Sequence, residues 1–402
     1  MEKLIGAMTA GVFLAATMWA CGANRSGDDS GDVPTIDWAQ DCATKVVDLH
    51  DFADIEYVPL ETNDSCLIQY ATQRAVSDSF IVIGDSFQDR IHVFDRKGKH
   101  LRSFGHKGGG PEEYQYMMDV VTDFDNNEVL VYDLKDNRFV RFGLDGKFRG
   151  VTKAQIKGRL DDVSNFDATY MIARNGKDLS LLPLEDNKEP YRYILINKQT
   201  GEVKPVPFEV KHPMGNGMTW EVEGGAIAVS VPISQVSSMG SGSALISDIS
   251  KDTVYQYAEN SFKPLFAFKN VDRKSYVVPE LPSVAFVAGD NVFIEYMRIT
   301  EINQTGAQFD ESKTYMYLFN KADGSLSKVD IKRPDLKDSG DNSQSLSRTS
   351  QSADGSTMAV PLQMEKLVEA LDNDNLTEEV KALVEGRSEE ANPIMMLVKF
   401  RK

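Results

Sequence analysis

Hydrophobic and polar residues alternate in a pattern that occurs twice between residues 79 and 147. Each copy has an apolar stretch that ends in Asp, a polar turn, a second apolar stretch and a hairpin centred on Gly. Asp85 and Asp133 lie 48 residues apart, and Gly98 and Gly146 have the same separation. Strands joined by tight turns and repeated at this interval are typical of the blades of a β-propeller.

The same hairpin signal returns later in the chain with weaker flanking similarity. Gly201 and Gly324 each follow a short apolar stretch and stand near Asn or Asp, and Asn260 occupies the corresponding turn between them. Gly accepts the positive φ that such turns need, and Asn tolerates it. The mean spacing from Gly98 to Gly324 is about 56 residues, so residues 35–402 accommodate six blades and one insertion.

The insertion is predicted near the end of the chain. Residues 364–371 and 376–386 have the apolar spacing of two short helices, and Asn375 is the expected N-cap of the second. A helical insertion at about 362–387 therefore interrupts the last blade.

Closure of the ring is predicted to join the two ends of the chain. The last blade ends with the apolar stretch 394–400, and one of two alternating stretches within 45–60 is expected to pair with it. A propeller commonly hides its first and last sheet edges in this way. The predicted fold is all-β: a six-bladed β-propeller of four-stranded antiparallel blades, with an N-terminal strand that closes the last blade.

Residues 1–20 have the pattern of an export signal. Lys3 precedes an uncharged, mostly apolar run that ends directly before Cys21. The run resembles a bacterial lipoprotein signal, in which the Cys becomes lipidated and begins the mature chain. The alternative is an ordinary cleaved signal with an incidental Cys. Residues 21–35 are rich in Ser, Gly and Asp and are expected to form a flexible acidic tether, which leaves 36–402 for the propeller.

The formal net charge of −17 narrows the classes of partner. An acidic surface repels phosphate backbones and anionic lipids, so we expect no nucleic-acid partner. Cys42 and Cys66 follow Cys21 in the chain. In an oxidising envelope they could form a disulfide, and the sequence leaves this pairing open.

Four segments, 58–62, 94–99, 105–114 and 392–394, carry a family resemblance. The most specific is the Gly-Gly-Pro-Glu-Glu-Tyr sequence within 105–114. Together they are similar to the six-bladed β-propeller lipoproteins of Gram-negative envelopes, which are related in style to NHL-repeat proteins. The resemblance implies the fold and a lipid-anchored location at the outer membrane, either exposed at the cell surface or facing the periplasm. It implies no reaction.

The glycine-rich loop 105–114 invites comparison with a phosphate cradle. Such a cradle needs successive backbone amides that lead into a helix. Pro111 removes one amide and two acidic residues follow, so a crossover between blades is the favoured interpretation. If the loop binds a ligand, the contacts would come from its polar and aromatic side chains: His106, Lys107, Glu113 and Tyr114.

Candidate metal sites are weak. Residues 123–128 begin like a calcium loop, but Glu128 stands where that loop needs Gly and Leu134 where it needs Glu, so a hairpin is expected. No two histidines have a compact metal spacing, and His92 and His100 are expected to face each other across one hairpin. The histidines are His50, His92, His100, His106 and His212. We expect neither a metal nor a cofactor.

Trp220 lies just beyond a Gly- and Met-rich stretch that joins blades three and four. It would reach the same face as Tyr114, where aromatic rings at a propeller mouth can stack on sugars or peptides. The alternative is that Trp220 belongs to the core between blades.

The functional prediction is a lipid-anchored, non-catalytic module that binds a carbohydrate, peptide or protein partner in the envelope. Its membrane partner would be the bilayer, through Cys21. One alternative is a lyase or hydrolase with its site in the central channel. A second alternative is an accessory to an outer-membrane transporter.

Overall fold

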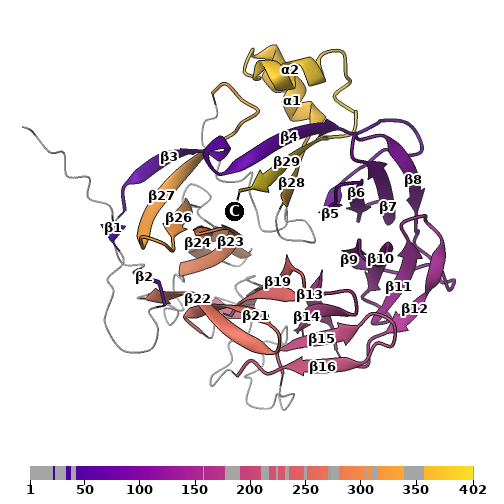
Figure 1. Ribbon diagram of the computed structural model, residues 1–402, viewed down its shortest axis with the longest axis horizontal. Helices are drawn as coiled ribbons and strands as arrows, with labels where there is room; N and C mark the ends of the chain where they lie inside the picture. Colours follow the sequence, from indigo (N-terminus) through magenta and orange to yellow (C-terminus); the bar gives the residue numbers. More distant parts are fainter. Residues whose placement is uncertain are drawn as a thin grey trace, which may run out of the picture.

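Six β-sheets are arranged as blades around a central axis (Figure 1). The strands of each blade follow one another from the axis to the rim, and the expected six-bladed propeller is confirmed. A computed structural model describes residues 21–22, 33–37, 42–156, 158–176, 191–209, 217–222, 225–230, 235–248, 251–269, 271, 280–303, 306–309, 315–338 and 357–401.

Five blades have four antiparallel strands, named from the axis outward. Blade one consists of β5 (Ala71–Val76), β6 (Phe80–Asp85), β7 (Arg90–Asp95) and β8 (His100–Phe104). Blade two consists of β9 (Met117–Asp123), β10 (Glu128–Asp133), β11 (Arg138–Gly143) and β12 (Phe148–Lys153). Blade three consists of β13 (Leu160–Asn165), β14 (Tyr170–Asn175), β15 (Tyr193–Asn197) and β16 (Val203–Val206). Blade four consists of β19 (Gln235–Gly240), β20 (Ser243–Ser247), β21 (Thr253–Ala258) and β22 (Ser261–Lys269). Blade five consists of β23 (Glu280–Ala288), β24 (Asn291–Asn303), β26 (Tyr315–Asn320) and β27 (Ser325–Lys332).

Blade six contains three strands among the described residues. They are β28 (Thr357–Leu362), β29 (Ile394–Phe400) and β4 (Ala53–Pro59). The N-terminal β4 pairs antiparallel with the C-terminal β29 over its full length, from Pro59 opposite Ile394 to Ala53 opposite Phe400. The predicted closure and the predicted propeller of four-stranded antiparallel blades are therefore confirmed.

The residues before β4 add strands to blades four and five and take no part in closing the ring. β2 (Thr35–Asp37) pairs in parallel with the outer strand of blade four, and β3 (Thr44–Asp48) does the same on blade five. The two-residue β1 (Cys21–Gly22) bridges to β27. A 3₁₀ turn, η1 (Leu49–Asp51), leads into β4. The N-terminal segment thus follows the rim past three consecutive blades (Figure 1).

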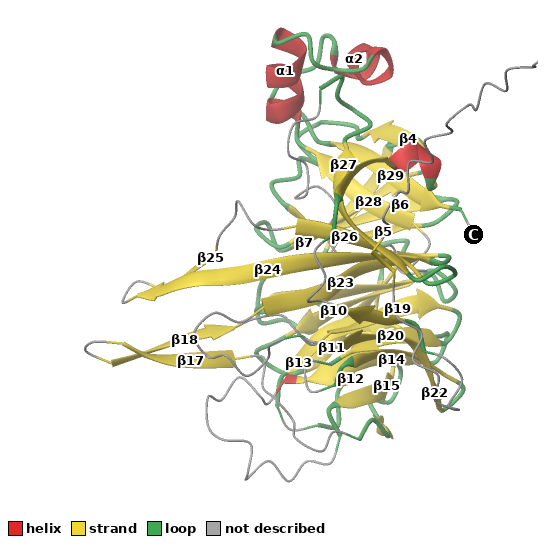
Figure 2. Cartoon of the chain, turned by 90° about the vertical axis from the view of Figure 1, so that its left-hand side faces the viewer, coloured by secondary structure: helices red, strands yellow, loops and turns green. Residues whose placement is uncertain are grey.

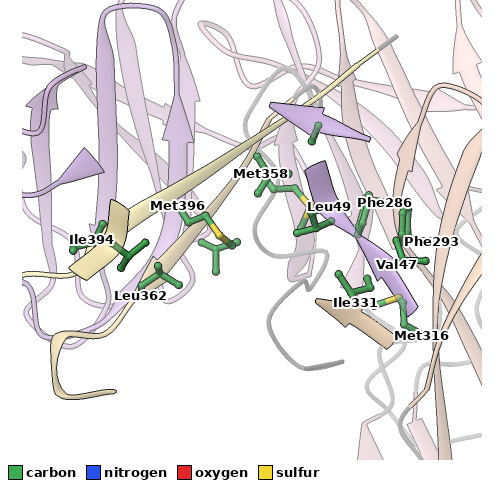
Figure 3. Packing of buried hydrophobic residues seen from close by; sticks show 14 of the residues in the cluster. Val47, Leu49, Phe286, Phe293, Met316, Ile331, Met358, Leu362, Ile394 and Met396 are labelled. Carbon is green, nitrogen blue, oxygen red and sulfur yellow. The ribbon is translucent and has the colours of Figure 1, made fainter. Parts of the chain in front are cut away.

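A core cluster packs this rim segment against blades five and six. Val47 and Leu49 lie in the same buried cluster as Phe293 of blade five and as Met358 and Met396 of blade six (Figure 3). Burying large apolar side chains contributes roughly 1.5–3 kcal/mol each. The N-terminal segment is therefore held by apolar packing as well as by backbone pairing.

The hairpins between the third and fourth strands explain the repeated glycines. Gly98 has a φ of +82°, and a Cβ built there would lie 2.2 Å from the backbone oxygen of Pro59 in β4. The carboxylate of Asp95 accepts hydrogen bonds from the amides of Lys97 and Lys99 at 2.8 and 3.0 Å. Only Gly fits this turn, because the closing strand passes directly over it.

The repeated aspartates end the second strand of blades one and two. Asp85 is fully buried and accepts hydrogen bonds from the amide of Gln69 at 2.6 Å and from that of Phe87 at 3.0 Å. One amide belongs to the loop that enters the blade and the other to the turn that follows β6. Asp133 accepts in the same way from Tyr116 at 3.1 Å. These carboxylates join neighbouring loops and are structural.

The propeller has two unlike faces. The crossover face carries the loops between blades and the turns between second and third strands, and the hairpin face carries the remaining turns. On the crossover face, β24 continues beyond blade five and pairs with β25 (Gly306–Phe309). The hairpin of β17 (Gly217–Val222) and β18 (Gly225–Ser230) contacts this extension. Figure 2 shows both projecting away from the blades.

The helical insertion is confirmed between β28 and β29. Helices α1 (Met364–Asp372) and α2 (Glu378–Val384) pack their buried residues on the cluster of blades five and six. The N-cap prediction was wrong, since Thr377 precedes α2. Asn375 instead accepts a hydrogen bond from the Asp338 amide at 2.8 Å. Among the described residues, no helix is long and apolar enough to span a membrane.

Asn392 fastens the two ends of the chain beside β29. Its side-chain amide donates to the backbone oxygens of Glu61 and Cys66 at 2.6 and 2.8 Å, and its side-chain oxygen accepts from the Ile68 amide at 2.7 Å. Asn392 is 1% exposed. One side chain therefore satisfies three buried backbone groups in the segment that leads from β4 into blade one.

We predict that Asn392→Ala lowers the free energy of unfolding by about 2–4 kcal/mol, because these backbone groups lose their partner in a buried site. Urea denaturation measures the change. Asn373→Ala is the matched control, since the exposed Asn373 amide makes a single bond within its own helix end. Equal losses for the two variants would contradict the role of Asn392 in closure.

Candidate ligand site at the channel mouth

The inner strands of blades one to four enclose a cavity of about 270 Å³ on the propeller axis. Each strand contributes four consecutive residues; those of β13 reach its hairpin-face end, and those of β19 begin at its crossover-face end. The lining residues are Thr72–Ala75 of β5, Asp119–Thr122 of β9, Asp162–Asn165 of β13 and Gln235–Ser238 of β19. The cavity therefore collects polar side chains from four separate repeats.

Two glutamines of the wall connect neighbouring blades. The side-chain amide of Gln73 in blade one donates to the Met118 oxygen in blade two at 3.4 Å. That of Gln235 in blade four donates to the Val284 oxygen in blade five at 3.0 Å. These bonds link β5 to blade two and β19 to blade five.

The inner strand of blade three is irregular where it lines the cavity. Asp162 has a φ of +53°, and the register with β14 shifts between Asp161 and Ser164. Arg174 stabilises the irregularity, because it binds Asp162 at 3.1 Å and Asp161 at 3.3 Å. Non-glycine residues with positive φ are uncommon and concentrate at functional sites. The bulge presents the charged Asp162 at the channel wall.

Asp119 is the unusual titratable group of the cavity. It lies on β9, and the nearby charge of Asp162 comes from the next blade. Burial, followed by the repulsion from Asp162, raises the pKa of Asp119 to about 7, although the amide of Val163 donates to its carboxylate. Near neutral pH this carboxyl group can therefore either donate or accept a hydrogen bond.

Exposed aromatic rings stand where the loops enter the inner strands. Tyr70 is 55% and Tyr116 54% exposed, and each directly precedes the inner strand of its blade. Phe87 is 68% exposed and contacts Tyr70 edge to face, with ring centroids 5.5 Å apart. We call Tyr70, Phe87 and Tyr116 the aromatic rim. Exposed aromatic rings at the entrance to strands that line a polar cavity are candidate ligand contacts.

The loop 105–114 is the crossover between blades one and two, as predicted. Tyr114 is fully buried in the core, and its hydroxyl donates to the Asp89 oxygen at 2.7 Å, so its expected place in a ligand site is wrong. Glu113 folds the loop by accepting from the Gly110 amide at 2.6 Å and by pairing with His106 at 2.8 Å. His106 and Lys107 are exposed, and their ligand role stays a prediction.

Trp220 lies on β17, in the hairpin between blades three and four that projects from the crossover face. The hairpin belongs to none of the blades. The prediction that this connection reaches the crossover face is therefore confirmed, and a ligand role for Trp220 stays a prediction.

The remaining candidates are structural where the chain is described. His92 and His100 both hydrogen-bond the hydroxyl of Ser103, at 2.8 and 2.9 Å, across the predicted hairpin. Burial lowers the pKa of His92 to about 4, so this ring is neutral. Residues 123–128 form the predicted hairpin of blade two. The described residues contain no cluster of three metal-ligating side chains.

Cys42 and Cys66 are both free, so the pairing that the sequence leaves open is not made. The physical reason is their location in different cores. Cys66 is buried between blades six and one, whereas Cys42 packs against the cluster of blades four and five.

Comparison with protein families gives one match over nearly the whole chain. Residues 33–399 match the family described as a domain of unknown function, DUF4934. The chain belongs to this family. Among curated proteins, no sequence matches it.

Several solved structures are similar to this DUF4934 protein. A "putative exported protein" of Bacteroides fragilis is 13% identical with a TM-score of 0.62, over 92% of this chain and 99% of that one. A DUF4221 member from Bacteroides vulgatus is 8% identical with a TM-score of 0.47, over 87% and 97%. Virginiamycin B lyase of Staphylococcus aureus is 10% identical with a TM-score of 0.33, over 69% and 98%.

The DUF4934 sequence alone does not single out the cavity or its rim. Asp119 and Asp162 look like ordinary strand residues, because nothing in one repeat shows that two adjacent blades bring their charges together. The aromatic rim does have a signal in the sequence, since Tyr70 and Tyr116 occupy the same place before two successive inner strands.

We predict that Asp119→Asn changes how the stability of this DUF4934 protein depends on pH. An Asp that titrates at about 4 when unfolded and at about 7 when folded costs stability as the pH rises between these values. The variant should exceed the wild type by about 1–2 kcal/mol at pH 8, after allowance for solvent screening, and equal it near pH 4. Urea unfolding across this range tests it, with the exposed Asp125→Asn as control. A difference independent of pH would contradict the assignment.

Proposed function

We propose that this protein is an exported, lipid-anchored binding module that holds a carbohydrate at the crossover-face mouth of its channel. The proposal rests on the exposed Tyr70 and Tyr116, which directly precede two of the inner strands that line the polar cavity. Flat rings offer apolar faces to the C–H faces of a sugar ring, and carboxyl and amide groups below can bond its hydroxyls. No catalysis is required for this role.

The size of the cavity favours the end of a ligand over the middle of a polymer. Ligand pockets usually measure about 300–1,000 Å³, so a cavity of about 270 Å³ is at the lower limit. The exposed rim above it would hold the next units of the same ligand. A folded protein partner would instead need about 800 Å² of complementary surface on each side.

The polar groups of the site suit a neutral ligand rich in hydroxyls. Asp162 is already neutralised by Arg174, and Asp119 is half protonated near pH 7. Asp119 and Asp162 can therefore offer hydrogen-bond acceptors and one hydrogen-bond donor without a large local charge.

Export and anchoring are supported by the N-terminal sequence. Residues 1–20 have the signal pattern that ends at Cys21, and a similar structure from Bacteroides fragilis belongs to a protein described as exported. We propose an outer-membrane location, with the bilayer as partner through acylated Cys21. Protease accessibility in whole cells distinguishes display at the cell surface from display toward the periplasm.

Binding is predicted to depend on the aromatic rim. A glycan array with the soluble domain should identify a retained carbohydrate, and Tyr70→Ala and Tyr116→Ala should each weaken its affinity roughly 3- to 10-fold, because each removes a stacking surface. Calorimetry measures the change, with Leu101→Ala on the outer strand of blade one as control. A domain that retains only peptides, or that co-purifies with an outer-membrane transporter, would exclude the carbohydrate proposal.

Attachment of the protein to the membrane is predicted to require the thiol of Cys21. Growth with a labelled fatty acid should mark the wild type and leave Cys21→Ala unmarked, because only a thiol at this position can be acylated. Cys66→Ala serves as the control and should be labelled like the wild type. Equal labelling of Cys21→Ala would refute the anchor.

A second candidate function is a lyase or hydrolase at the same cavity. Asp119 favours it, since a carboxyl group with a pKa of about 7 is suited to general acid–base catalysis, and the ionised Asp162 stands beside it. In that case Asp119→Asn would keep binding and lose turnover of the bound carbohydrate. An intact carbohydrate after long incubation with the wild type would exclude this candidate.

A further inference from the structure

The hairpin face has a larger hollow that the proposed function does not use. It measures about 1090 Å³ and is lined by turns and strand ends from blades two to six. We call it the hairpin-face basin. Its volume lies at the upper end of the range for ligand pockets, so it is large enough for a ligand of several units.

The charges of the basin are divided between two walls. Lys263 of β22, Lys321 in the turn after β26 and Lys399 of β29 come from three consecutive blades, four to six. Asp125 and Asp167 belong to blades two and three. The net charge of the chain is −17, so a wall with three lysines departs strongly from the rest of the surface.

The acidic residues of the basin are mostly engaged elsewhere. Asp54 pairs with Arg401 at 3.0 Å. Asp167 accepts the amides of Thr169 and Tyr170, both at 2.7 Å, within its own turn. The three lysines form no ion pair within 4 Å among the described residues. None of the three lysines therefore has a direct ionic partner in the part of the chain that the structure describes.

Lys321 and Lys263 repel each other inside this wall. Burial lowers the pKa of Lys321; the attraction of Asp290 raises it, and the smaller repulsion from Lys263 lowers it further. A bound anion would relieve this repulsion and restore the lost solvation of the ammonium groups. Lysines act as point charges that accept an anion from several directions, which suits carboxylate or sulfate groups spaced along a flexible chain.

The floor of the basin is apolar. Phe166 is buried, and Leu265, Val287 and Phe400 are half-buried beside the lysines. Phe400 stacks on Phe286 of blade five, with ring centroids 4.8 Å apart, which keeps the end of the chain in place. A ligand with anionic groups along one side and C–H surfaces on the other would match the three lysines and the apolar residues. Inorganic anions alone would leave the floor unused.

We infer that the hairpin-face basin is a second binding site, for an acidic oligosaccharide whose carboxylate or sulfate groups face Lys263, Lys321 and Lys399. The site lies on the opposite face from the aromatic rim and takes a charged ligand where the rim takes a neutral one. The inference stands independently of the proposed function.

Titration of the full-length wild type with galacturonate oligomers of three to five units tests it, with galactose oligomers of equal length as the neutral arm. We expect the acidic oligomer to bind and the neutral one to fail. The triple variant Lys263→Gln, Lys321→Gln, Lys399→Gln should bind roughly 10- to 100-fold more weakly, and the wild-type affinity should fall as salt rises.

A matched triple variant controls for net charge. Lys97→Gln, Lys99→Gln and Lys147→Gln remove three exposed lysines from turns and strand ends on the same face that do not line the basin, and this variant should bind like the wild type. Tyr70→Ala should also leave acidic binding unchanged, so failure at one face is distinguishable from failure at the other. Equal binding of both oligomers, equal loss in both triple variants, or binding of anionic vesicles but not of the oligomer would overturn the inference.

Discussion

The backbone pairing of β4 with β29 is the interaction on which the rest of the structure depends. A ring of sheets has no stable end unless its first and last edges meet, because unpaired edge strands expose a row of amide and carbonyl groups. Here the two edges come from opposite ends of the chain. The Asn392 side chain and Gly98 hold the joint, one by bonding backbone groups and the other by allowing close approach.

Closure also fixes the channel. Each inner strand is positioned only by its neighbours, so the cavity among β5, β9, β13 and β19 exists because the ring returns on itself. The side chains of Gln73 and Gln235 add hydrogen bonds between neighbouring blades. The N-terminal segment adds strands to blades four and five at the rim, where it stabilises the half of the ring nearest to the closure.

The two faces of the propeller offer different chemistry from one scaffold. The crossover face combines aromatic rings with a carboxyl group that titrates near neutrality, whereas the hairpin face combines lysines with an apolar floor. The turns of the hairpin face are short and regular, and the crossover face carries the long connections and projecting hairpins (Figure 2).

The sequence by itself determined the blades, their closure and the helical insertion, because each depends on a local pattern. The spacing of Asp85 and Asp133, and of Gly98 and Gly146, reflects turn chemistry that is complete within one repeat. The sequence also predicted that the loop 105–114 is a crossover between blades. The tertiary structure alone decided that Tyr114 is core, that Cys42 and Cys66 lie apart, and that Asp119 meets the charge of Asp162. The raised pKa of Asp119 and the lysine wall of the hairpin-face basin both depend on groups that are far apart in the sequence. Neither of the sequence segments involved shows that the fold brings these groups together.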